Sequence, residues 1–157
     1  MEQDMLEYLS VLDGIRRSLE QLTDLDQQKT EAVRKDDLDS LNEILKKEQA
    51  MSLTMRGQEQ KRLKLSETLH LQDVPLRQLP KKYPDDLYLR AKDTVENLTR
   101  QYELYQCASE VARNTLECNL HEIEKVLSQV GGNLPMGPGY SSPDVAPPAP
   151  MKTDFRA

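Results

Sequence analysis

The sequence has few of the residues that build a broad globular core. Residues of the hydrophobic class make up 37% of the 157-residue chain, whereas charged residues make up 31%. Such a balance is typical of elongated helices, which have a large surface and a thin core. The length is that of one domain rather than two.

Long apolar segments and long basic segments are both absent from the sequence. No stretch reaches the roughly 18 apolar residues that a membrane span needs, so we expect no membrane insertion. The chain starts with Met1-Glu2-Gln3-Asp4, and no apolar core follows a basic start, so we expect no secretory signal and a cytoplasmic location. The formal net charge is −6 and no Lys/Arg run supplies a basic face, which argues against nucleic-acid binding.

The chain has only two cysteines, Cys107 and Cys118, and both fall within one expected helix. Their Cα atoms would lie roughly 16 Å apart along that helix. A disulfide needs Cα atoms within about 7 Å, so the two cannot pair while the helix exists. We expect two reduced thiols, consistent with the cytoplasm, that pack as small buried apolar side chains.

The motifs of common active sites are missing as well. The sequence contains no Gly-rich phosphate loop and no CxxC, HExxH or GxSxG pattern. We expect His70 to cap a helix or to be solvated, and His121 cannot share a helix face with its neighbour Glu122. We therefore expect no catalytic residues, no metal site and no cofactor, and we disfavour the alternative of an unrecognised enzyme.

The most regular feature of the sequence is apolar spacing of three and four residues. This spacing predicts long amphipathic helices over residues 3–35, 37–70 and 85–130. Asp36-Asp37 interrupts the pattern, and Asp is a favoured residue at a helix N-terminus. The segment from Leu71 to Pro84 holds three prolines, which predicts an ordered connection with one short helical turn. Gly131-Gly132 is expected to end the third helix.

The apolar stripe of the second predicted helix is incomplete. Glu48, Gln58 and Arg62 occupy three of its positions. The stripe is therefore either shallowly buried or lined with buried polar pairs.

Together these patterns predict an all-α fold of long antiparallel amphipathic helices, as a helical bundle or coiled coil. We expect a helical domain over residues 1–131 and a disordered Pro/Gly-rich tail over residues 132–157. The spacing does not distinguish packing within one chain from packing between chains, so a homo-oligomer remains open.

The end of the third predicted helix has a widened apolar face. It is suited to hold a helix of another protein, because an amphipathic helix buries its apolar side in such a groove. The alternative is that the protein's own core uses the whole stripe. The candidate partner-binding residues are Ala112, Leu116, Leu120, Ile123, Val126 and Leu127.

Over residues 5–130 the sequence resembles the FlgN family of flagellar export chaperones. The resemblance lies in the order and spacing of short segments between an opening Leu-rich helix and a final Gly/Pro tail. These segments are Lys29–Val33, Asp36–Leu41, Lys47–Ala50, Gln58–Arg62 with an E-x-x-R step from Glu59 to Arg62, Leu76 and Leu79, Asn114–Leu116, and Ile123.

The resemblance implies a cytoplasmic export chaperone. Proteins of this family bind the C-terminal helices of hook-associated (hook–filament junction) proteins, prevent their premature assembly and deliver them to the type III export apparatus. A contact with the export gate would fall to the tail, where Tyr140 is a candidate anchor. The alternative is a self-associating coiled-coil scaffold with no role in export.

Overall fold

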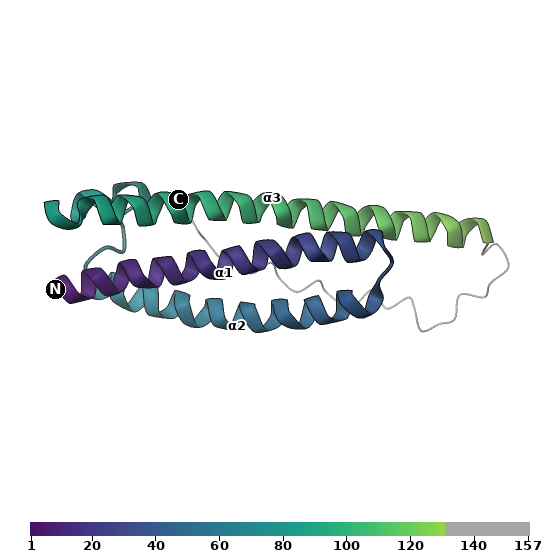
Figure 1. Cartoon of the computed structure of the whole chain (residues 1–157), viewed down its shortest axis with the longest axis horizontal. Coiled ribbons are helices and arrows are strands. Elements are labelled where there is room, and N and C mark those ends of the chain that lie inside the picture. Colours follow the sequence, from purple (N-terminus) through teal and green to yellow (C-terminus); the bar gives the residue numbers. More distant parts are fainter. Residues whose placement is uncertain (131–157) are drawn as a thin grey trace.

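The computed structural model describes residues 1–130 and is helical through most of that length (Figure 1). The elements are α1 (Glu2–Arg34), α2 (Leu38–Thr68), the 3₁₀ helix η1 (Leu76–Lys82) and α3 (Asp85–Val130). The predicted all-α bundle is confirmed. The expected tail, with Tyr140, lies outside the described residues. None of the described helices is long and apolar enough to cross a membrane.

Helix α1 lies between α2 and α3 and packs against both (Figure 1). Consecutive long helices are antiparallel, so α1 and α3 run in the same direction. The Tyr83 hydroxyl donates to the Met5 carbonyl, and Gln101 donates to the Thr23 hydroxyl; each bond joins residues 78 positions apart. The first bond holds the start of α1 to the segment just before α3, and the second joins α1 to α3 itself.

The core is built around the stripe of α1 that the 3–4 spacing predicts. Leu9, Leu12, Ile15 and Leu19 are fully buried in it. Leu79 of η1 is equally buried, and its cluster also takes in Leu71 and Tyr83 from either side of η1. The predicted ordered connection with a short helical turn is therefore confirmed, and it closes one end of the bundle.

Helix α2 is held to α1 as much by polar pairs as by apolar contact. Each polar residue of its stripe meets a side chain of α1: the Lys29 ammonium lies 2.7 Å from Glu48, the Ser18 hydroxyl donates to Gln58 at 2.9 Å, and Arg62 donates to the Tyr8 hydroxyl at 3.4 Å. Most of the stripe is only half-buried. Both alternatives raised by the sequence are therefore true of this stripe: it is shallowly buried, and it is lined with polar pairs.

The ends of α1 and α2 are fixed by local hydrogen bonds. The Asp37 carboxylate accepts from the Ser40 amide at 3.2 Å, as predicted for an N-terminal Asp. Helix α1 ends in a Schellman turn with Asp36 at φ 53°, and α2 ends in the same way with His70 at φ 54°. His70 is thus a capping residue through its backbone, and its side chain is exposed.

Candidate partner-binding surface

Helix α3 continues well beyond the end of α1. Val33 and Arg34 at the end of α1 line a hollow together with α3 residues as far along as Asn119 and Glu122, so α1 ends beside that part of α3. Every residue from Leu120 to Val130 is exposed, and this part extends past α1 over about 16 Å or three helical turns. No described helix runs beside its far end (Figure 1). We call residues 113–130 the α3 extension: residues 113–119 lie beside the end of α1, and residues 120–130 lie beyond it.

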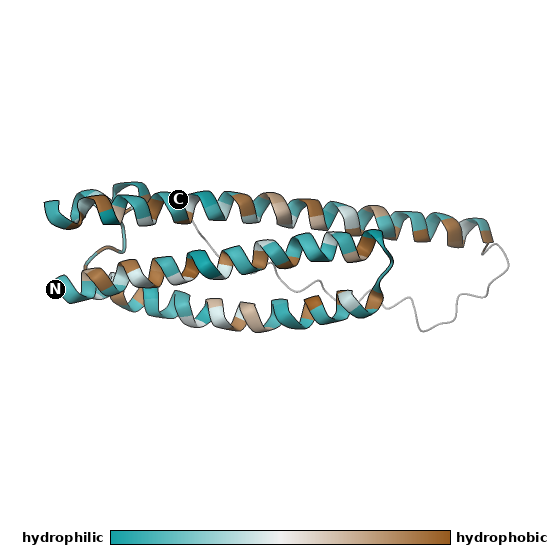
Figure 2. Ribbon diagram, viewed as in Figure 1, coloured by the Kyte–Doolittle hydropathy of each residue, from teal (hydrophilic) through white to brown (hydrophobic). Residues whose placement is uncertain are grey.

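The apolar stripe of α3 runs on without a change of face from the core into the extension. Ala112 is the last buried residue of α3, with 2% of its surface exposed. Leu116 is half-buried, and Leu120 is 58% exposed. Hydrophobic residues recur along the extension in Figure 2. The exposed large apolar side chains of this part are Leu120, Ile123, Val126, Leu127 and Val130.

The predicted partner-binding residues differ in exposure. Leu120, Ile123, Val126 and Leu127 are exposed, so a partner could reach them. Leu116 is half-buried, and Ala112 is buried inside the bundle, where a partner could not reach it. Periodicity alone placed all these residues on one face and could not show where along that face α1 stops.

The prediction that both cysteines are buried was wrong. Cys107 and Cys118 are free thiols, and both are exposed. They fall outside the 3–4 stripe of α3, on the side of the helix turned away from the core face. The frequent burial of free cysteine was a weaker guide here than the helical position.

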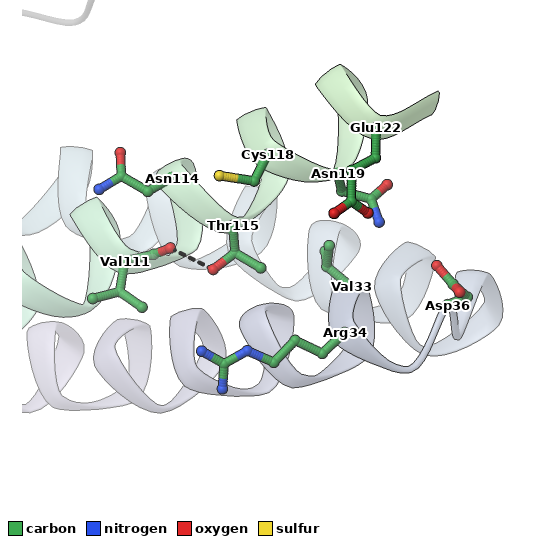
Figure 3. Close-up of a pocket in the computed structure, with 9 residues that line it drawn as sticks. All are labelled: Val33, Arg34, Asp36, Val111, Asn114, Thr115, Cys118, Asn119 and Glu122. Carbon is green, nitrogen blue, oxygen red and sulfur yellow. Dashed lines mark hydrogen bonds between the residues drawn. The ribbon is translucent and has the colours of Figure 1, made fainter. Parts of the chain in front are cut away.

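A hollow of about 470 Å³ lies at the base of the extension, where α1 turns into α2 (Figure 3). The Arg34, Asp36 and Glu122 side chains give it charge, and the Thr115 hydroxyl already donates to the Val111 carbonyl at 2.8 Å. The full lining is Val33, Arg34, Asp36, Val111, Asn114, Thr115, Cys118, Asn119 and Glu122. No pattern in the sequence indicates this hollow, because its position depends on which turn of α3 faces the α1–α2 connection.

The most buried charged group of the described chain lies elsewhere, in the middle of the bundle. Asp26 of α1 is 5% exposed, and its Oδ2 atom has no hydrogen-bond partner. Lys29 lies 3.4 Å from Asp26 and 2.7 Å from Glu48 of α2. Burial, together with the neighbouring Glu48 carboxyl, raises the pKa of Asp26 to about 6.

The third helix completes this cluster. Burial raises the pKa of the Tyr105 phenol of α3, and the Asp26 carboxylate adds to the effect. All three long helices thus meet at a polar cluster made of Asp26, Lys29, Glu48 and Tyr105. Because these groups interact with one another across the helices, we assign the cluster to the packing of the bundle rather than to a ligand site.

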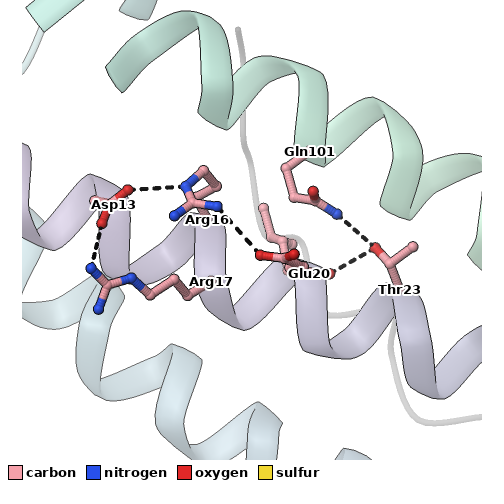
Figure 4. A network of polar contacts seen from close by, with 7 residues as sticks. Asp13, Arg16, Arg17, Glu20, Thr23 and Gln101 are labelled. Carbon is pink, nitrogen blue, oxygen red and sulfur yellow. Dashed lines mark hydrogen bonds and ion pairs between the residues drawn. The ribbon is translucent and has the colours of Figure 1, made fainter. Parts of the chain in front are cut away.

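A second polar network lies on the surface of α1 (Figure 4). Asp13 pairs with Arg16 at 2.9 Å and with Arg17 at 2.8 Å. Partial burial alone would raise the pKa of Asp13, but the two guanidinium groups outweigh it and hold the pKa below its usual value. Such ion pairs within one helix contribute little to binding or catalysis, so this network is structural.

Chemistry at a metal is not supported in the part of the chain that the structure covers. No group of three or more His, Cys, Asp or Glu side chains there is arranged to hold a metal ion. Comparisons with protein-family models, curated proteins and solved structures give no match to this chain. The α3 extension, with its exposed apolar face, is therefore the candidate functional site on structural grounds.

Proposed function

We propose that this protein is a cytoplasmic chaperone of flagellar type III export. It binds the C-terminal helices of hook-associated proteins, keeps these subunits from assembling early and delivers them to the export apparatus. One observation carries the proposal: the core face of α3 continues for about three turns past the end of α1 and stays exposed there, from Leu120 to Val130. The resemblance of residues 5–130 to the FlgN family supplies the kind of partner.

The size of the exposed face fits a partner that must later be released. Each half-exposed Leu, Ile or Val gains roughly 1 kcal/mol when a partner helix covers it. The five exposed side chains of the extension would contribute about 5 kcal/mol before the costs of association. Because association costs at least about 4 kcal/mol, these side chains alone support only weak binding, which allows the export apparatus to remove the subunit.

The proposal is tested by titrating the full chain with the C-terminal helical segment of a hook–filament junction protein in a calorimeter. We expect the double substitution Leu120→Asp and Leu127→Asp to weaken binding at least about tenfold, because two carboxylates would be buried without partners. Ser128→Asp adds a charge to the far face of the same helix and should leave affinity unchanged. If the native chain does not bind any such segment, the proposal fails.

A second candidate function is a self-associating coiled-coil scaffold. The same exposed face supports it, because two α3 extensions could pair with each other instead of with a partner. Light scattering of the full chain over a range of concentrations separates the two. The molar mass of an export chaperone with a free extension should stay constant, whereas the molar mass of a self-associating scaffold should increase with concentration.

The proposed contact of the tail with the export gate has a separate test. Tyr140→Ala should weaken capture of the chain by the isolated gate protein and leave binding of the junction-protein segment unchanged. Equal capture of both forms of the chain would remove Tyr140 from the proposal.

A further inference from the structure

We propose that the α3 extension accepts a partner helix that carries Lys or Arg beside its apolar stripe, and that the same charges reject a second copy of this chain. The inference rests on the proposed function only in taking the α3 extension as the docking surface. It adds the chemistry of the occupant.

The apolar face of the extension follows a heptad pattern. Leu116, Leu120, Ile123, Leu127 and Val130 step by 4, 3, 4 and 3 residues, which are the core positions of a coiled coil. In this register Glu117 and Glu124 occupy the same flanking position in successive heptads, directly beside the seam. A helix packed on the seam would pass along these two carboxylates.

The cations of the extension do not offset this acidic edge. Lys125 lies on the face opposite the seam, and Arg113 lies at the base, one turn before Glu117. On the other side of the helix Glu122 borders the hollow beside Asp36. A partner helix with Lys or Arg at its flanking positions would therefore meet opposite charges along the extension.

A second copy fits the seam in shape when the two extensions run antiparallel. Leu116 would then face Leu127 of the second copy, and Leu120 would face its Ile123, so the apolar layers match. The same register sets Glu117 of each copy near Glu124 of the other, because like flanking positions meet in an antiparallel pair. Two like-charge pairs oppose this dimer.

A parallel pair of extensions is excluded by the fold itself. The seam of each extension continues into the face of α3 on which the chain's own α1 packs, and α1 runs in the same direction as α3. A second α3 running in parallel would have to pass through the space that α1 fills. The occupant that remains is a helix of another protein, with positive charge beside its apolar stripe.

Two synthetic helical peptides of 18 residues test the charge requirement on the full chain. Both carry Leu at the core positions; one carries Lys and the other Glu at the flanking positions. We expect the Lys peptide to bind roughly tenfold or more tightly than the Glu peptide in calorimetry, and this preference to shrink in high salt. Equal affinities, or no binding of either peptide, would overturn the inference.

Charge reversal on the extension should invert that preference. With Glu117→Lys and Glu124→Lys together, we expect the Glu peptide to bind more tightly than the Lys peptide. The matched control is Glu103→Lys with Glu110→Lys, at the same heptad position but in the part of α3 where α1 covers the face. An unchanged preference in the first variant, or the same inversion in the control, contradicts the inference.

Rejection of a second copy has its own test. The single change Glu124→Lys would set a cation near Glu117 of the second copy at both ends of the antiparallel pair. We expect this variant to dimerise in sedimentation equilibrium at a concentration where the native chain and the double variant stay monomeric. Dimerisation of the native chain would overturn this part of the inference. So would the finding that the native chain, the single variant and the double variant are all monomeric.

The two proposals fail in different ways. If the Lys peptide binds but no junction-protein segment does, the inference stands and the flagellar partner is wrong. If a junction-protein segment binds while the two peptides bind equally, the proposed function stands and the charge requirement is wrong.

Discussion

Among single residues, Asp26 is the one whose charged side chain is the most costly to bury in the bundle. Its carboxyl is almost fully buried, and one of its oxygens is unpaired although Lys29 lies nearby. The folded protein holds a proton there up to about pH 6, whereas the carboxyl of an unfolded chain loses it near pH 3.8. The stabilising effect of this proton is thus complete below pH 3.8 and is lost as the pH rises through 6.

We predict that Asp26→Asn stabilises the protein more at pH 7.5 than at pH 4.5. The amide keeps the shape of the carboxyl and carries no charge to bury. The difference in unfolding free energy between the variant and the native protein should therefore be larger at pH 7.5 than at pH 4.5, by up to roughly 2 kcal/mol. Urea unfolding of both proteins at the two pH values measures it. Asp24→Asn, at an exposed neighbouring position, is the control. A gap that is the same at both pH values would contradict the assignment.

The two helix-ending residues Asp36 and His70 give a second prediction at this scale. Both have φ values near +54°, a conformation that glycine adopts without a steric cost. We expect Asp36→Gly and His70→Gly each to raise stability by about 0.5–1 kcal/mol in thermal unfolding. Ser52→Gly, in the middle of α2, should lower stability by a similar amount. Loss of stability in both capping variants would show that their side chains matter more than their backbone.

At the scale of the helix, α3 consists of two parts that differ in the burial of their apolar face. Up to Ala112 its apolar face is part of the core, Leu116 is half-buried, and from Leu120 onward the same face is exposed. The sequence predicted the length of this helix and its continuous stripe, because both follow from local spacing. It could not predict the division, since that depends on the length of α1 and on the register between two helices.

This division predicts that alanine substitutions of two leucines on the same face of α3 differ strongly in their effect on stability. Leu98 is 5% exposed, so Leu98→Ala should destabilise the protein by about 2–4 kcal/mol. Leu120 is 58% exposed, so Leu120→Ala should change stability by less than about 0.5 kcal/mol. Urea unfolding followed by far-UV circular dichroism measures both. A large loss for Leu120→Ala would mean that the extension packs against another part of the protein.

At the scale of the whole molecule, the fold class and the three long helices were accessible from the sequence. The 3–4 spacing, the Asp37 cap and the prolines of the connection each act over a few residues, so each leaves a local pattern. The pairs between α1 and α2, the hollow beside Arg34 and the exposure of Cys118 depend on contacts between distant segments. No local pattern in one sequence encodes those contacts.

The most direct test of the central claim is hydrogen–deuterium exchange of the full chain with and without the C-terminal helical segment of a hook–filament junction protein. Amides of residues 113–130 belong to a helix that stands largely alone, so they should exchange quickly in the free protein. We expect the segment to slow exchange in residues 113–130 and to leave the cores of α1 and α2 unchanged. Protection confined to α1 and α2, or no change anywhere, would contradict a chaperone that holds its partner on the end of α3.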